Sequence, residues 1–141
     1  MEETNDLLKR LNNSKNLEAL SEYLEKIDST DSCLLNEHIK ELMKSRQINS
    51  SELIRRSRIE RTYCYQILNG RKKPGRDKLI SIALALNLEL NETQRLLEIA
   101  KEGVLYVKSK RDSILIFAIN QKMSVLDTNF LLTQYEEAEL K

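Results

Sequence analysis

Residues 49–70 read NSSELIRRSRIERTYCYQILNG, and this stretch decides how the rest of the sequence is interpreted. Its apolar side chains recur at helical spacing before and after Arg58, which predicts two short helices joined by a tight turn. The second helix is expected to span Ile59–Leu68 and to end at Gly70, a good helix terminator. The side chains expected to face inward are Leu53, Ile54, Ile59, Cys64 and Ile67.

The second of these helices carries a polar outward face. Arg61 and Tyr65 are four residues apart, as are Thr62 and Gln66, so the two pairs form adjoining stripes. Arginine can bind guanine, glutamine can bind adenine, and a threonine methyl can touch the thymine methyl, so all four side chains are candidates for base contacts. Taken alone, the charge pattern fits an ordinary polar helix surface better.

The composition of the whole chain favours an all-α fold. Its 141 residues include three glycines and one proline. A β-sandwich or barrel needs many turn residues, and the phosphate loops of nucleotide enzymes need glycines, so both are excluded. No apolar run approaches the roughly 18 residues of a membrane span, and the acidic first residues do not form a signal peptide. We expect a soluble, cytoplasmic protein.

Charge is unevenly distributed along the chain. The formal net charge is +1, which by itself argues against nucleic-acid binding. Residues 55–78, however, hold nine basic and two acidic residues, a net charge of +7. Residues 1–37 carry four basic and nine acidic residues, and residues 79–141 carry seven basic and nine acidic residues. The near-neutral total therefore hides one strongly basic window between acidic flanks.

Apolar periodicity predicts further helices on both sides of the quoted stretch. A loop or linker is expected at Ser29–Ser32, and Ser50 or Ser51 is expected to cap the helix that carries Leu53. The expected flanking helices lie around Leu7–Leu11, Leu17–Ile27, Leu35–Arg46, Leu79–Leu86, Asn91–Ala100, Lys110–Gln121 and Val125–Tyr135.

Three regions follow from this pattern. Residues 1–32 form an acidic helical extension, residues 33–102 form the central domain, and residues 103–141 form a helical extension that packs on the core or dimerises. Ile80 and Leu84 lie off the main apolar stripe of their helix, so the C-terminal helices are expected to cover them. The last region is expected to supply four core residues, Ile114, Leu115, Phe117 and Phe130, and weak exposed ion pairs from Arg111 and Asp112.

The central region resembles the phage-repressor-like helix-turn-helix family of the Cro/cI or XRE type. The resemblance covers about residues 34–100, and Asp77–Leu88 looks like the fourth helix of that family. It implies a lambda-repressor-like five-helix core with additional helices at both ends, in a bacterial transcription regulator. The residues at matching spacings are Asn49, Glu52, Leu53, Ile59, Cys64, Ile67, Gly70 and Pro74.

The resemblance also implies how the protein would bind double-stranded DNA. The recognition helix would enter the major groove with Arg61, Thr62, Tyr65 and Gln66 toward the bases. Members of the family usually bind as homodimers on two half-sites, and the C-terminal helices are the first candidate for the dimer face. The implied phosphate contacts are Ser50, Arg71, Lys72, Lys73 and Arg76.

Three departures from the family pattern keep an alternative open. Ser50 replaces the usual glutamine, Ile54 replaces a small alanine, and Arg58 replaces the turn glycine. Either Arg58 adopts an unfavourable backbone conformation or the turn differs. The alternative is a protein-interaction or adaptor module that keeps the fold and uses its N- or C-terminal helices.

An enzyme is the least favoured class. His38 is the single histidine, and Cys33 and Cys64 lack metal-ligand spacing, so neither a metal nor a cofactor is expected. No nucleophile and base stand in a recognisable pattern. Tyr63 is expected to pack at the edge of the domain.

Overall fold

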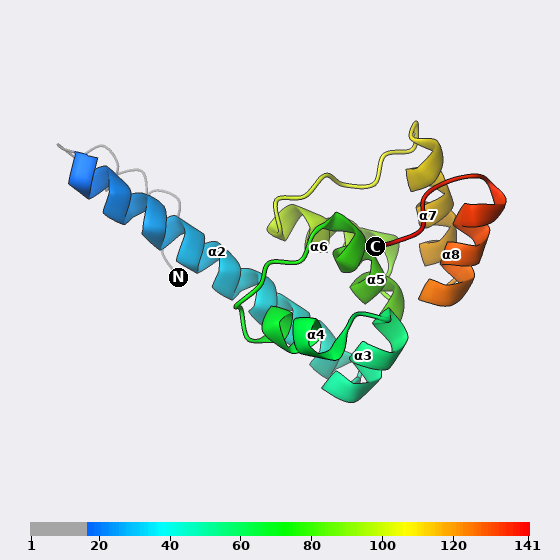
Figure 1. Cartoon of the computed structure of the whole chain (residues 1–141), viewed down its shortest axis with the longest axis horizontal. Coiled ribbons are helices and arrows are strands. Elements are labelled where there is room, and N and C mark those ends of the chain that lie inside the picture. The colour runs from blue at the N-terminus through cyan, green and yellow to red at the C-terminus, as the bar shows by residue number, and fades with distance from the viewer. Residues whose placement is uncertain (1–16) are drawn as a thin grey trace.

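The computed structural model describes residues 17–141, and of residues 26–33 it describes the backbone only. This part of the chain is all-helical and contains no strand, as the composition predicts. The helix expected around Leu7–Leu11 lies outside the described residues. The helices are α2 Leu17–Ser45, α3 Ser50–Ser57, α4 Arg61–Leu68, α5 Arg76–Ala85, α6 Leu90–Ile99, α7 Lys110–Asn120 and α8 Val125–Gln134 (Figure 1).

Helix α2 runs unbroken through Ser29–Ser32, so the loop expected there was wrong. In a helix, serine, threonine and aspartate each cost only about 0.5 kcal/mol of free energy relative to alanine, and packing elsewhere along the helix can offset this cost. Leu35 and Ile39, in the C-terminal half of α2, are buried in the core, whereas Leu17 is exposed. Figure 1 shows the N-terminal half of α2 projecting beyond the other labelled helices.

Helix α5 is the centre of the fold. Every residue from Leu79 to Leu86 is buried, because α3, α6, α7 and α8 all pack against this helix. A helix that is apolar on nearly all sides has to be covered on all sides. Ile80 and Leu84 are therefore buried, and α7 and α8 pack on α5 as expected.

Several predicted helix ends shift once hydrogen bonds decide them. Asn49 caps α3, because its side chain accepts a hydrogen bond from the Glu52 amide at 2.9 Å, and Ser50 and Ser51 lie inside the helix. Helix α6 begins at Leu90 behind a capping box of Glu89 and Glu92. The predicted bounds of α7 and α8 are confirmed to within one residue.

Two phenylalanines predicted for the core are exposed. The side chains of Phe117 and Phe130 are 52% and 75% exposed, whereas Leu115 is buried and Ile114 is half-buried. Leu115 and Phe117 are two residues apart on α7, so they point to nearly opposite sides of the helix. The periodicity identified α7 correctly, but the choice of Phe117 as a core residue was wrong.

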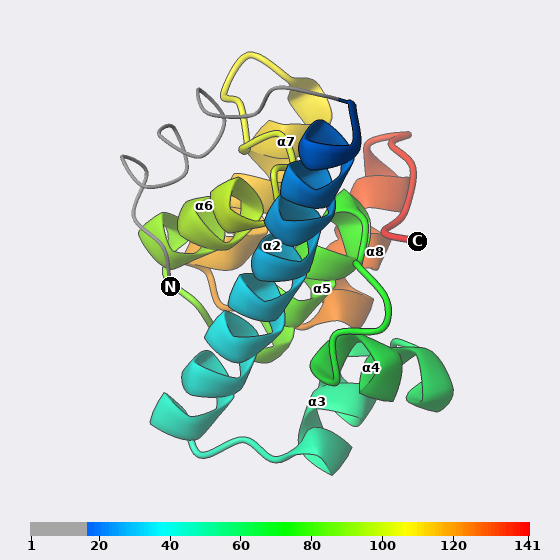
Figure 2. The same cartoon turned by 90° about the vertical axis from the view of Figure 1, so that its left-hand side faces the viewer.

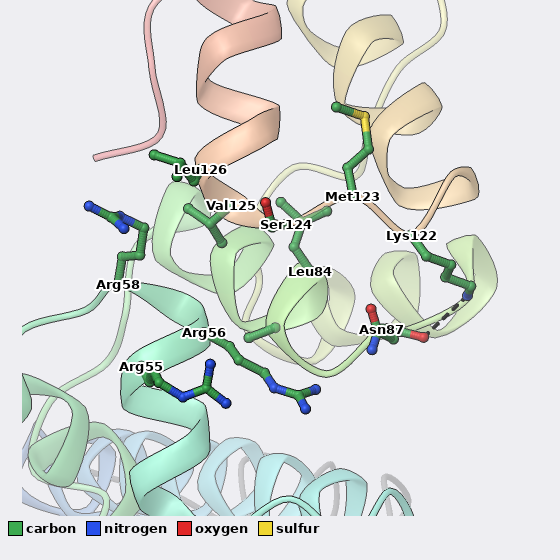
Figure 3. Close-up of a pocket in the computed structure, with 11 residues that line it drawn as sticks. Arg55, Arg56, Arg58, Leu84, Asn87, Lys122, Met123, Ser124, Val125 and Leu126 are labelled. Atoms are coloured by element: carbon green, nitrogen blue, oxygen red, sulfur yellow. Dashed lines mark hydrogen bonds between the residues drawn. The ribbon is translucent and has the colours of Figure 1, made fainter.

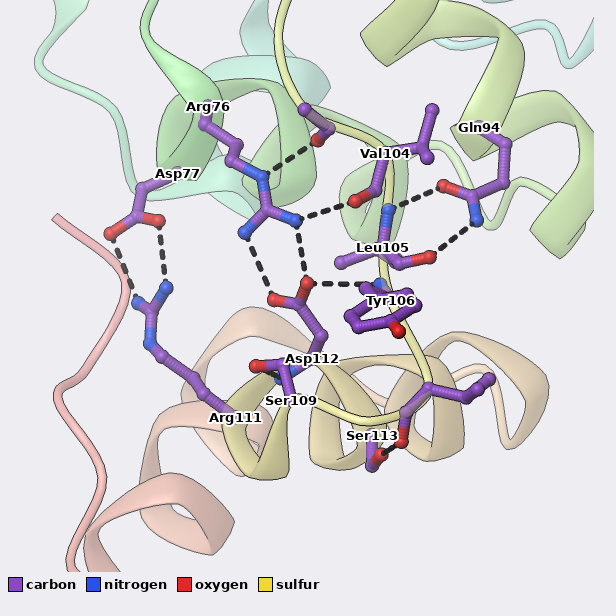
Figure 4. Close-up of polar contacts among 12 residues, drawn as sticks. Arg76, Asp77, Gln94, Val104, Leu105, Tyr106, Ser109, Arg111, Asp112 and Ser113 are labelled. Atoms are coloured by element: carbon purple, nitrogen blue, oxygen red, sulfur yellow. Dashed lines mark hydrogen bonds and ion pairs between the residues drawn. The ribbon is translucent and has the colours of Figure 1, made fainter.

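The N-terminal turns of α5 and α7 are joined by two crossed ion pairs. Arg76 binds the Asp112 carboxylate with both of its terminal nitrogens, at 2.9 and 2.7 Å. Arg111 binds Asp77 in the same way, with both distances at 3.0 Å (Figure 4). The expected ion pairs of Arg111 and Asp112 therefore exist, but they are partly buried and bidentate rather than exposed and weak.

The arrangement separates α3 and α4 from the first of the C-terminal helices. In both views α3 and α4 lie at the bottom of the molecule and α7 lies above them (Figure 1, Figure 2). Helix α4 packs on α2 and α3 and leaves its other side open. None of the helices α2–α8 combines the length and apolar character that a membrane span requires.

Candidate nucleic-acid interface

The turn between α3 and α4 is built on a left-handed residue. Arg58 has φ 60° and ψ 21°, and its amide donates to the Ile54 carbonyl oxygen at 3.1 Å. The Ser57 hydroxyl accepts a hydrogen bond from the Ile59 amide at 3.3 Å. Of the two alternatives open at Arg58, the structure shows the unfavourable conformation, which keeps the turn short and the two helices in contact.

Helix α4 begins at Arg61, two residues later than predicted, because Glu60 caps it. The Glu60 carboxylate accepts hydrogen bonds from the amides of Thr62 at 3.0 Å and Tyr63 at 2.9 Å. These two hydrogen bonds, that of Thr62 first, lower the pKa of Glu60. This cap was not predicted from the sequence, although an acidic residue ahead of an apolar period is a common helix start.

The other end of α4 is held by α2. Asn36 Nδ2 donates to the Leu68 carbonyl oxygen at 3.1 Å, which satisfies an acceptor that the helix leaves open. Gly70 then takes φ +81° and closes the helix with a hydrogen bond from its amide to Ile67. Nothing in the sequence around Asn36 signals this contact, which spans 32 residues of chain.

The side of α4 away from the core has the predicted polar composition. Arg61, Thr62 and Tyr65 are exposed and Gln66 is half-buried. The Arg61 guanidinium lies 5.6 Å from the centre of the Tyr65 ring, a cation–π contact that orients both side chains. Tyr63 is half-buried at the edge of the core, as expected.

A cationic loop starts where this face ends. The amides of Arg71 and Lys72 both donate to the Gln66 carbonyl oxygen, at 2.9 and 3.1 Å. The side chains of Arg71, Lys72 and Lys73 are exposed, and the buried Pro74 anchors the loop. The structure thus brings the predicted base-contacting residues and three of the predicted phosphate-contacting residues together.

The remaining two predicted phosphate contacts differ from these three. Ser50 is half-buried in the first turn of α3. Arg76 is held by Asp112 and by the carbonyl oxygens of Gly103 at 2.7 Å and Val104 at 3.0 Å (Figure 4). Four of its five N–H groups are therefore used inside the protein, and we remove Arg76 from the set of phosphate contacts.

The remaining candidate groups are the metal-ligating and sulfur side chains of the described residues. No three His, Cys, Asp or Glu side chains of residues 17–141 are grouped in a way that would hold a metal ion. Cys64 is buried, and this burial raises the pKa of its thiol.

Comparison of the chain with protein-family models, with curated proteins and with solved structures finds no match. The all-α class therefore rests on the structure itself. The phage-repressor-like core stays a prediction from the residues that carry the resemblance.

Proposed function

We propose that this protein is a sequence-specific DNA-binding transcription regulator of a bacterial cytoplasm. Helix α4 would enter the major groove of double-stranded DNA. The observation that supports this proposal is the joining of an exposed polar helix face to an exposed cationic loop. Both ends of α4 are fixed by hydrogen bonds, through Glu60 and Asn36, so the face is presented in one orientation.

The two parts of this surface have different tasks. Arg61, Thr62, Tyr65 and Gln66 would read base edges, which distinguishes one sequence from another. The loop of Arg71, Lys72 and Lys73, together with Ser50, would bind phosphates, which gives affinity and register for every sequence alike.

The test starts with DNA selected from a random library by the full-length protein. Binding is then measured by fluorescence anisotropy at several salt concentrations for wild type, Arg61→Ala and Lys72→Ala. Lys72→Ala should weaken binding to all DNA sequences equally. It should also reduce the slope of log affinity against log salt concentration by about one unit. Arg61→Ala should reduce the binding free energy for the selected sequence by about 1–3 kcal/mol and should affect other sequences much less.

Lys108→Ala is the matched control, because Lys108 is an exposed cation in the segment between α6 and α7. That segment lies away from α4 (Figure 1), so DNA binding should stay at the wild-type level. Absence of salt-dependent binding to any DNA would contradict the proposal.

An interaction module is the second candidate, and the exposed apolar side chains of α7 and α8 favour it. Phe117 and Phe130 are exposed, and Phe117 lines a hollow of about 330 Å³ together with Ser113, Ile114, Leu131 and Tyr135. A regulator that binds two half-sites would use such a face to form a homodimer. An adaptor would use it for another protein.

Light scattering separates these two uses of the α7–α8 face. A dimeric wild type that becomes monomeric in Phe117→Ser and in Phe130→Ser supports the homodimer. A monomeric wild type that co-purifies with a stoichiometric protein, and fails to bind the selected DNA in its presence, supports the adaptor.

A further inference from the structure

The structure divides the basic window of the sequence into two surfaces. Arg71–Lys73 follow α4, whereas the arginines at the end of α3 face the start of α8 across an open hollow of about 360 Å³. Figure 3 shows the α3 arginines on one side, Met123–Leu126 on the other and Leu84 between them. The residues that line the hollow include Arg55, Arg56, Arg58, Leu84, Val125 and Leu126.

The arginines of this hollow have spare capacity for an anion. The side chains of Arg55 and Arg58 form no ion pair or hydrogen bond with any described residue. Arg56 has a single contact to Glu52, at 3.3 Å, and both side chains are 37% exposed, so that pair is weak. No carboxylate is among the described residues that line the hollow.

The fourth cation at the hollow has a structural task. Lys122 donates to the Glu89 carboxylate at 2.9 Å and to the carbonyl oxygens of Asn87 and Leu88. It ties the α7–α8 turn to the end of α5 and so fixes the far wall. The excess positive charge therefore comes from the three arginines on one side.

The base of the hollow and its opposite wall carry apolar side chains. Leu84 and Val125 are buried residues whose surfaces reach the hollow, and the exposed Leu126 extends this wall. A volume of about 360 Å³ is at the lower end of ligand sites, which are largely apolar with a few placed polar groups. Guanidinium groups bind phosphate with two parallel hydrogen bonds, which an ammonium group cannot do.

We propose that this hollow binds a small organic phosphate. The phosphate would bind on the arginine side of the hollow, and the organic part would lie on Leu84 and Val125. Neither α4 nor the loop of Arg71–Lys73 lines the hollow, so this site is separate from the proposed DNA surface. Its ligand would contact the turn that leads into the recognition helix, which is the link to regulation.

The probe is phenyl phosphate, added to the isotope-labelled full chain without DNA and followed by amide shifts in NMR spectra. Shifts are expected at Arg58 and at the first turn of α8. Phenyl phosphate should bind at least about tenfold more tightly than benzyl alcohol, which lacks the charge, and more tightly than inorganic phosphate, which lacks the ring.

Two variants test the arginines without disturbing the fold. Arg58→Gly removes the guanidinium and suits the left-handed backbone at that position, and Arg55→Gln changes an exposed side chain. Each variant should reduce the affinity for phenyl phosphate at least about tenfold, because one charge-assisted bidentate contact is lost. Lys72→Gln, in the proposed DNA surface, should bind phenyl phosphate like the wild type.

Three results would overturn the proposal. They are equal binding of phenyl phosphate and benzyl alcohol, wild-type affinity in both arginine variants, and shifts confined to Arg71–Lys73. Because no DNA is present, this experiment and the DNA titration can fail independently.

Discussion

At the scale of single residues, the clearest strain lies in the backbone at helix ends. Six of the described residues have a positive φ although they are not glycine. All of them follow the end of a helix, where a left-handed residue lets the next amides bond back to open carbonyls. With three glycines in the chain, other residues occupy these positions, at about 1 kcal/mol each. They are Gln47, Arg58, Asn87, Lys101, Lys122 and Glu136.

Gln47→Gly should therefore stabilise the protein. Gln47 is exposed, has φ 54° and follows α2, so the change removes backbone strain and little else. We expect the free energy of unfolding to rise by about 0.5–1 kcal/mol, the relief of strain less the added chain entropy. Urea denaturation monitored by circular dichroism measures it.

Gly70→Ala is the reciprocal control for this change. Its φ of +81° disfavours alanine, and a new Cβ would lie 3.3 Å from Asn36 Nδ2. The free energy of unfolding should fall. A drop for Gln47→Gly, or no change for Gly70→Ala, would show that these helix ends are not strained as described.

At the scale of one element, Glu60 decides how α4 begins. Its carboxylate holds the amides of Thr62 and Tyr63, and these contacts lower its pKa. A carboxylate whose pKa is lower in the folded state than in the unfolded state stabilises the folded protein at pH values above its unfolded-state pKa. This stabilisation is lost as the pH falls through the folded-state pKa. Glu60→Ala should therefore reduce stability at neutral pH and much less below about pH 4.

The measurement is urea denaturation of both proteins at neutral and acidic pH, with hydrogen exchange of the Thr62 and Tyr63 amides as a local readout. Faster exchange at these two amides, and not at the start of α6, would identify the cap as the cause. A difference between the proteins that is independent of pH would argue against the carboxylate.

At the scale of the whole molecule, Asp112 joins the C-terminal helices to the core. Its side chain is 8% exposed. The carboxylate accepts hydrogen bonds from both terminal nitrogens of Arg76 and from the Tyr106 amide, the latter at 3.0 Å. Asp112→Asn would leave the Arg76 guanidinium without its charged partner. We expect a loss of about 3 kcal/mol, the lower end for a broken buried pair because Arg76 is 26% exposed.

The same pair predicts a pH dependence. Burial alone would raise the pKa of Asp112, but the hydrogen bonds from Arg76 and Tyr106 outweigh it and lower the pKa. The wild type should thus be more stable than Asp112→Asn above about pH 4, and the two should converge as the pH falls further. Thermal unfolding across this range checks it, with the exposed Glu98→Gln as control.

Local patterns of the sequence predicted much of this molecule. The helical period fixed the class and the bounds of α7 and α8, and the four-residue spacing identified the exposed side of α4. These features depend on hydrogen bonds and side-chain directions within a few residues, so a short stretch of sequence is enough to predict them. The cationic loop after α4 was predictable for the same reason.

Contacts between distant residues were decided only by the tertiary structure. Helix α2 continues through Ser29–Ser32, Phe117 is exposed, and Arg76 is engaged with Asp112, 36 residues away. The tertiary structure also places Arg55 and Arg58 beside α8 rather than beside the loop after α4. A one-dimensional charge window cannot distinguish these surfaces, because helix direction and the element packed opposite determine where each side chain points.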